Sequence, residues 1–397
     1  MAVEVMPFGV KCNIQCQYCY QNPMRDAGNL PRSYDLEKLK DSIEAEGRPF
    51  GLFGGEPLLM PRSDLEDLWA WGLRRFGRNS IQTNGTLIDD DHIRLFKKYR
   101  VNVGISLDGP GELNDARWAG SLNSTRRATA KVEAVIERLC AEGVALSLIV
   151  TLTRCNAAPD KVAGLYTWMH HLDAIGVRRV RLHVLESENA VIRSRYGLTT
   201  AENVAALSGF LRLEPQLKQL TFGLFDDMRN MLLGRDDHAS CVWMACDPHT
   251  TAAVTGIGGM GQRRNCGRTN KDGIDYVKAD AAGFERYLAL YLTPQDAGGC
   301  QDCRFFLFCK GQCPGTSLAG DWRNRSEHCE VWKALYETLE TQLQEAGEQP
   351  LSRSPHREEI EQAFLSAWCR GRPTTLAAVL RSSDPQLVAG SRGSAHA

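Results

Sequence analysis

The chain has 397 residues, of which 43% are hydrophobic and 24% are charged, and this ordinary globular composition argues against disorder along most of its length. Its net charge is −1, so we expect no broad binding to nucleic acid or to an anionic membrane. No apolar run is long enough to span a membrane, and the first residues lack the basic start of a signal peptide. These features predict a cytoplasmic protein, in which the 14 cysteines indicate metal ligands or catalytic groups rather than disulfides.

Strand-like and helix-like segments alternate through the first half of the chain. We expect strands over residues 3–8, 48–53, 80–83, 101–107, 144–152 and 177–185. We expect helices between them over residues 35–46, 64–75, 89–99, 126–142 and 160–175. Such repeats with short loops predict an α/β fold with a parallel sheet. Because a closed barrel needs eight units, six predict a partial (β/α)6 barrel of the TIM type, with its chemistry at the carboxyl ends of the strands.

The end of the first strand leads into Cys12-x3-Cys16-x2-Cys19, with Tyr18 directly before the third cysteine. Three thiolates in one tight loop can hold three irons of a 4Fe–4S cluster, which leaves the fourth iron open to another ligand. Zinc is the weaker alternative, because a structural zinc site takes four ligands and no matching Cys or His pair follows nearby.

This spacing resembles the signature of the radical S-adenosylmethionine (SAM) superfamily. Three later segments, at the ends of successive predicted strands, resemble the segments that surround SAM in that family: Gly54-Gly55-Glu56-Pro57, Gln82-Thr83-Asn84-Gly85 and Ser106-Leu107-Asp108-Gly109-Pro110. Each alone reads as a turn, but their order argues against coincidence. Glycines let backbone approach a ligand closely, and a glutamate can accept from an ammonium group. The resemblance implies cofactor contacts from Tyr18, Gly54, Gly55, Glu56, Pro57, Gln82, Asn84, Ser106, Asp108 and Arg117.

What the resemblance implies about chemistry is specific. The open iron binds the amino and carboxylate groups of SAM, and an electron from the cluster cleaves SAM to methionine and a 5′-deoxyadenosyl radical. That radical abstracts a hydrogen atom from the substrate, while the protein orients the reactants and excludes solvent.

Eight more cysteines lie between Cys241 and Cys329. Their spacing resembles the SPASM domain, a C-terminal extension of radical SAM enzymes that holds two auxiliary 4Fe–4S clusters. The resemblance assigns the first auxiliary cluster to Cys241, Cys246, Cys266 and Cys313. It assigns the second to Cys300, Cys303, Cys309 and Cys329, which makes three clusters in all. Two zinc ribbons are the alternative. If Cys241 were not a ligand, the first auxiliary cluster would have an open iron for substrate.

The sequence offers few candidate catalytic residues. Tyr20 directly follows Cys19, although a packed aromatic explains it equally well. His183 and Glu186 lie at the end of the sixth predicted strand, where a solvated strand end is an equally good explanation. Asp247 is an acidic alternative that also suits a turn. The remaining cysteines, Cys140, Cys155 and Cys369, are best explained as small buried hydrophobes, with a catalytic role left open for Cys155.

We therefore expect a radical SAM barrel over residues 1–235, a SPASM domain over 236–335, a helical extension over 336–382 and a mobile tail over 383–397. The apolar face of the extension either packs against the barrel or docks a partner.

The favoured function is oxidative modification of a ribosomally made peptide, by crosslinking, epimerisation or side-chain oxidation. Only eleven residues precede Cys12, so we expect direct reading of the peptide or a separate leader-binding protein, and a reductase, flavodoxin or ferredoxin as electron donor. Gly267 stands where sulfatase maturases carry an aspartate base, and this difference argues against a sulfatase-maturing function for this chain. The alternatives are a dehydrogenase of a sugar or aminoglycoside alcohol, and an iron–sulfur electron carrier that would form no 5′-deoxyadenosine.

Overall fold

The computed structural model describes residues 3–187, 189–239, 241–247, 249–250, 253–264, 266, 268, 279 and 282–382. The chain divides into two compact units, of which the first contains Met1–Gly223 and Thr255–Val277 and the second contains Leu224–Val254 and Lys278–Ala397. The predicted mobile tail over 383–397 lies outside the described residues. Within the described part of the chain, no helix is both long and apolar enough to cross a membrane.

The first unit is built on one sheet, whose strand order is β7-β6-β5-β4-β3-β2-β1-β8-β9. The six predicted strands are present as β1 (Val3–Met6), β2 (Phe50–Leu52), β3 (Asn79–Thr83), β4 (Val101–Ser106), β5 (Leu146–Leu152) and β6 (Arg179–Val184). Each pairs in parallel with its neighbours in chain order, which confirms the partial (β/α)6 barrel.

Three short strands that the sequence did not predict extend the sheet at its edges. They are β7 (Thr221–Phe222), β8 (Gly256–Gly258) and β9 (Arg263–Arg264). β8 runs parallel to β1, and β9 runs antiparallel to β8. Strands of two or three residues are too short to show an alternating pattern, so the sequence carries no signal for them.

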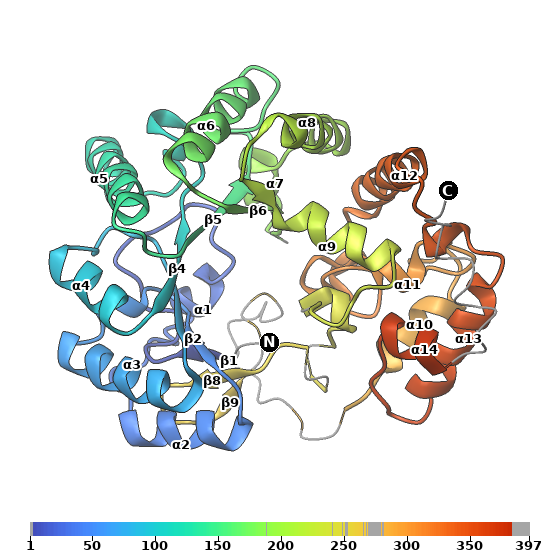
Figure 1. The fold of residues 1–397 in the computed structure, drawn as a ribbon, viewed down its shortest axis with the longest axis horizontal. Helices are drawn as coiled ribbons and strands as arrows, with labels where there is room; N and C mark the ends of the chain where they lie inside the picture. Colours follow the sequence, from blue (N-terminus) through green and yellow to red (C-terminus); the bar gives the residue numbers. More distant parts are fainter. Residues whose placement is uncertain are drawn as a thin grey trace, which may run out of the picture. The chain divides into compact units, whose positions relative to one another are not determined.

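Helices cover the outer face of this curved sheet, as Figure 1 shows for α2 to α6. The first unit contains α1 (Asn22–Asp26), α2 (Leu36–Glu46), η1 (Pro57–Leu59), α3 (Arg62–Phe76), α4 (Asp90–Lys98), η2 (Gly111–Asn114), α5 (Leu122–Ala141), α6 (Val162–Ile175), α7 (Ala190–Tyr196), α8 (Thr200–Leu213) and η3 (Glu214–Gln216). Asp35 caps α2 by accepting from the Lys38 N–H at 3.1 Å. Asp89 caps α4 in the same way, by accepting from the His92 N–H.

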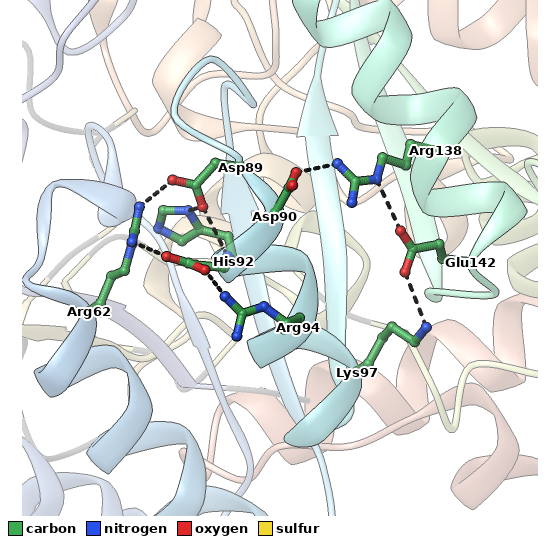
Figure 2. Close-up of polar contacts among 9 residues, drawn as sticks. Arg62, Asp89, Asp90, His92, Arg94, Lys97, Arg138 and Glu142 are labelled. Carbon is green, nitrogen blue, oxygen red and sulfur yellow. Dashed lines mark hydrogen bonds and ion pairs between the residues drawn. The ribbon is translucent and has the colours of Figure 1, made fainter.

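A chain of ion pairs links α3, α4 and α5 on the outside of the barrel (Figure 2). Arg62 of α3 pairs with Asp89 at the start of α4, while Arg138 of α5 pairs with Asp90 and contacts Glu142 at 3.0 Å. These side chains are largely exposed, so each pair contributes at most about 1 kcal/mol. The pairs help to hold neighbouring helices side by side on the sheet.

The second unit is mostly helical, which confirms the cysteine-rich C-terminal region with terminal helices. It contains α9 (Gly223–Leu232), η4 (Cys241–Met244), α10 (Glu285–Leu292), α11 (Phe306–Cys309), η6 (Pro314–Thr316), η7 (Leu318–Gly320), α12 (Cys329–Glu345), η8 (Leu351–Arg353), α13 (Arg357–Trp368) and α14 (Leu376–Ser382). Trp368 of α13 contacts the rings of Phe284, Tyr287 and Phe306 at centroid distances of 5.4–6.1 Å. The apolar face of the extension therefore packs inside its own unit.

Candidate active site and iron–sulfur sites

The loop with Cys12, Cys16 and Cys19 follows the carboxyl end of β1. Its backbone is fixed by bonds to a distant segment, because the N–H groups of Gln15 and Gln17 donate to the carbonyls of Trp118 and Ala116 at 2.7 and 2.9 Å. The pKa of the Cys16 thiol is raised to about 12, chiefly by burial, with the neighbouring Cys19 and Cys12 thiols contributing. Three partly buried thiols in one loop ionise most readily against added positive charge, so the loop fits a metal cluster.

Gly54 and Gly55 bring the end of β2 against this cysteine loop. The Gly55 N–H donates to the Gly9 carbonyl at 2.9 Å, and the Glu56 N–H donates to the Lys11 carbonyl at 2.9 Å. A Cβ on Gly55 would lie 1.9 Å from the Lys11 oxygen. The sequence suggested that these glycines approach a ligand; here their lack of side chains lets two protein segments meet.

The Glu56 carboxylate joins three segments of the site. It is buried and accepts from the Thr83 hydroxyl at 2.7 Å and from the Asn84 N–H at 2.9 Å. The Asn84 amide in turn donates to Asn13 Oδ1 at 2.8 Å and lies 3.7 Å from the Cys12 sulfur. Burial raises the pKa of Glu56 in spite of these donors. The ends of β2 and β3 and the cysteine loop therefore form one hydrogen-bonded network.

Tyr18, Asp108 and Arg117 meet in a buried group beside the cysteine loop. The Tyr18 hydroxyl donates to the Asp108 carboxylate, and Arg117 Nη1 donates to the Tyr18 oxygen at 3.0 Å. The Thr151 N–H, on β5, also donates to Asp108 at 2.9 Å. Arg117 opposes the effect of burial on the pKa of Cys16, so it supplies positive charge close to the thiols.

A small cavity adjoins this group, and three of the predicted cofactor contacts line it: Asn84, Ser106 and Arg117. Gln82 supports the wall, because its amide donates to the Ser106 hydroxyl at 2.8 Å. Pro57 is buried at the start of η1. The carboxyl ends of β3 and β4 thus meet around one space next to the cysteine loop.

A second cluster of polar side chains surrounds Arg268, a residue that the sequence did not single out. Arg268 forms an ion pair with Glu186, lies 3.4 Å from Nδ1 of His183 and stacks over the Tyr20 ring at 5.3 Å. Burial lowers the pKa of His183 well below its usual range, with Arg268 as the next cause, so the imidazole is neutral. Because the cluster depends on residues far apart in the chain, no short motif reveals it.

Asp247 belongs to the second unit, whereas Tyr20, His183 and Glu186 belong to the first. Its carboxylate accepts from the N–H groups of His249 and Thr250 at 2.8 and 3.0 Å. These are the bonds of a capped turn.

Cys155, the cysteine for which a catalytic role was left open, packs against a buried cluster that contains Tyr18 and Tyr196. Burial is the main cause that raises the pKa of its thiol, so it is protonated near neutral pH. Cys140 lies on α5, and Cys369 is exposed after α13.

The predicted ligands of the first auxiliary cluster are divided between the units. Cys266 belongs to the first unit, and it raises the pKa of the nearby Tyr20 hydroxyl, for which burial is the main cause. The other three belong to the second unit: Cys241, Cys246 and Cys313. Their joint role stays a prediction.

The predicted ligands of the second auxiliary cluster all line one small cavity, which we name the four-cysteine cavity. Its cysteines are Cys300, Cys303, Cys309 and Cys329. Burial raises the pKa of the Cys300 thiol to about 12, and Cys303 and Cys329 add to the effect. Among the described residues, no group of three His, Cys, Asp or Glu side chains is arranged to share one metal ion. Four cysteines around one cavity match the ligand number of a 4Fe–4S cluster, and that cluster stays a prediction.

Arg286 organises the loops around this cavity, a role that no motif indicated. Its fully buried guanidinium donates to the carbonyls of Trp322, Lys310 and Gln312 at 2.7, 3.3 and 3.2 Å, and to that of Asn324 at 3.1 Å. Lys310 and Gln312 have φ angles of 52° and 56°, a conformation that is unfavourable for residues with a side chain. Arg286 thus holds a strained segment between two of the C-terminal cysteines.

Comparison with known proteins agrees with the resemblance that the first cysteine motif and the strand-end segments indicated. Residues 6–156 match the model of the Radical SAM superfamily. A serine-type anaerobic sulfatase-maturating enzyme of Bacteroides thetaiotaomicron is 36% identical over 132 residues, which are 28% of this chain and 30% of the relative. A cysteine-type anaerobic sulfatase-maturating enzyme of Clostridium perfringens is 31% identical over 129 residues, 29% of this chain and 35% of the relative. The chain thus spans about a third of the length of these two relatives.

A solved structure has a fold similar to that of this chain over most of both chains. It is native anSMEcpe with bound AdoMet and the Cp18Cys peptide, with a TM-score of 0.69 and 18% identity, and the match covers 87% of this chain and 98% of that one.

Proposed function

The chain carries a domain of the radical SAM superfamily, and on this premise we propose that it is an oxidative maturase that modifies a side chain of a peptide or protein. The observation that carries the proposal is the front site. Three partly buried thiols lie in one loop, next to Asn84 and to the Tyr18–Asp108–Arg117 group. The named activities of the relatives, which mature sulfatases, support a protein or peptide as substrate.

The residues of this chain have distinct roles in the proposal. Cys12, Cys16 and Cys19 hold a 4Fe–4S cluster, and the cavity beside Asn84, Ser106 and Arg117 receives SAM. When bound, this pair would supply a 5′-deoxyadenosyl radical that takes one hydrogen atom from a substrate carbon. The external electron comes from a reductase, flavodoxin or ferredoxin. Burial of the site keeps water from the reacting groups.

The substrate radical must then lose one electron and one proton to complete a two-electron oxidation. We assign the proton to the Arg268 cluster, where Glu186 forms an ion pair with the guanidinium and His183 is neutral. Either group can accept a proton, and Tyr20 borders them through Arg268. This cluster would replace the aspartate base that is missing at Gly267, a position outside the described residues. An auxiliary cluster held by the C-terminal cysteines would accept the electron.

The first test is anaerobic reconstitution of the full chain, followed by iron and sulfide counting and by an assay for 5′-deoxyadenosine with dithionite and SAM. We expect about twelve irons per chain, as three 4Fe–4S clusters require, and SAM cleavage that disappears in Cys16→Ala. Synthetic peptides with a central Ser or Cys should lose two hydrogen equivalents, as measured by mass spectrometry. No 5′-deoxyadenosine would overturn the enzyme assignment, and oxidation of a sugar alcohol in place of any peptide would overturn the substrate class.

The proton-acceptor assignment has its own test. We expect Glu186→Gln with His183→Ala to lower oxidised product by about 10²-fold or more, while 5′-deoxyadenosine still forms, because hydrogen abstraction precedes proton loss. His171→Ala with Glu137→Gln is the matched control, since that pair lies at 3.4 Å with both side chains about half exposed. Product formation that is unchanged in the first double variant would contradict the assignment.

A further inference from the structure

Two buried N–H groups around the four-cysteine cavity have no hydrogen-bond acceptor among the described residues. They are the indole Nε1 of Trp332 and the Nε of Arg325, and both residues line the cavity. A buried donor without a partner costs about 1–3 kcal/mol, so native proteins rarely leave one. Two such donors around one cavity indicate that an acceptor belongs inside it.

A second nitrogen of Arg325 is hydrogen-bonded and holds the side chain in place. Its Nη1 donates to the Gly299 carbonyl at 2.8 Å and also to the Gln295 carbonyl. Lys333 lines the same cavity and is held by Gln295 Oε1 at 2.9 Å. The cavity therefore carries two cationic side chains, and none of the described residues that line it is acidic.

This lining fits an anionic occupant with soft acceptor atoms. A 4Fe–4S cluster with four thiolate ligands is negatively charged, and its sulfurs accept N–H hydrogen bonds. Positive charge and N–H donors stabilise the reduced cluster, which bears the extra electron, more than the oxidised one, and this raises the reduction potential.

We propose that Trp332 and Arg325 donate N–H···S hydrogen bonds to an iron–sulfur cluster bound in the four-cysteine cavity, and that these bonds raise the reduction potential of that cluster. The inference rests on the proposed function. Trp332 and Arg325 are positioning residues that act on the potential and not on the substrate.

The experiment measures the potential and not turnover. The full-length variant Cys12→Ala/Cys16→Ala/Cys19→Ala removes the front site, and it is reconstituted and titrated under electron paramagnetic resonance (EPR). The signal that Cys303→Ala abolishes belongs to the four-cysteine cavity. We expect Trp332→Phe to retain iron and to lower the potential of that signal by a tenfold change in the reduction equilibrium, about 59 mV for one electron. Trp368→Phe, the same substitution in the same unit outside the cavity, should leave the signal unchanged.

A second measurement does not depend on the Trp332→Phe variant. In the same cysteine background, pulsed EPR should detect couplings from a nitrogen and its exchangeable deuteron after transfer to heavy water. An unchanged potential in iron-loaded Trp332→Phe would overturn the inference, as would the absence of these couplings or of any signal that depends on Cys303. Loss of SAM cleavage in the native chain, with the titration as expected, would instead count against the proposed function.

Discussion

Replacing Gly55 with alanine is expected to reduce SAM cleavage by about 10²-fold or more, since displacement of reacting groups by about 1 Å costs that much. The added Cβ would lie 1.9 Å from the Lys11 carbonyl oxygen and 2.6 Å from the Val10 carbonyl carbon. Both are backbone atoms of the segment that leads into Cys12, so the clash cannot be relieved by a side-chain rotation. The segment must move, and the thiols move with it. The measurement is 5′-deoxyadenosine formation at saturating SAM, together with iron content.

Gly77→Ala is the matched control for this prediction. Gly77 follows α3 with a φ of 73°, but a Cβ there meets no atom within 4 Å. The substitution should cost about 1–2 kcal/mol of stability through the left-handed backbone alone, and leave SAM cleavage unchanged. Equal losses of cleavage in the two variants would show that general destabilisation, and not displacement of the cysteine loop, explains Gly55→Ala.

Arg286→Met is expected to destabilise the second unit by more than about 4 kcal/mol, the range reached when a buried hydrogen-bond network is broken. The variant leaves the carbonyls of Lys310, Gln312 and Trp322 buried without their donor. It also removes the bonds that hold Lys310 and Gln312 in a left-handed conformation. The segment before Cys313 should then relax, and the protein should lose the iron of the C-terminal clusters while the front cluster is retained.

Thermal unfolding and iron counting check this prediction, with Arg323→Met as the control. Arg323 pairs with Asp321 in the same region, but its side chain is 65% exposed, so its loss should change stability by no more than about 0.5 kcal/mol. Arg286→Lys separates charge from geometry, because one ammonium group cannot reach acceptors spread around a planar guanidinium. Full iron content in Arg286→Met would contradict the assigned role.

The fold was predictable where long buried strands and amphipathic helices repeat. The apolar runs of β4, β5 and β6 and the capping aspartates of α2 and α4 are local signals, and the structure has these elements within a few residues of the predicted bounds. β8 was missed because Gly256–Gly258 has no side-chain pattern at all, and only its pairing with β1 makes it a strand.

The parts of the candidate site that were predictable are those that short sequence motifs contain. The cysteine spacing and the segments that end in Glu56, Asn84 and Asp108 are such motifs. Arg268 and Arg286 were not found, because their roles depend on partners tens of residues away, and a single arginine in a sequence has no signature. The cluster and SAM contacts themselves stay predictions until the reconstitution is done.

The way in which the cysteine loop is held has a consequence for biosynthesis. Cys12, Cys16 and Cys19 are translated before the segments that hold their loop in place. The loop is fixed by bonds to Gly55 and Asn84, and by the carbonyls of Ala116 and Trp118, which are made later. The nascent loop therefore lacks these bonds until β4 and the segment after it have been translated. Iron delivered before that point would meet three thiols on an unconstrained segment, so productive loading of the front site requires that the chain be translated at least to Trp118.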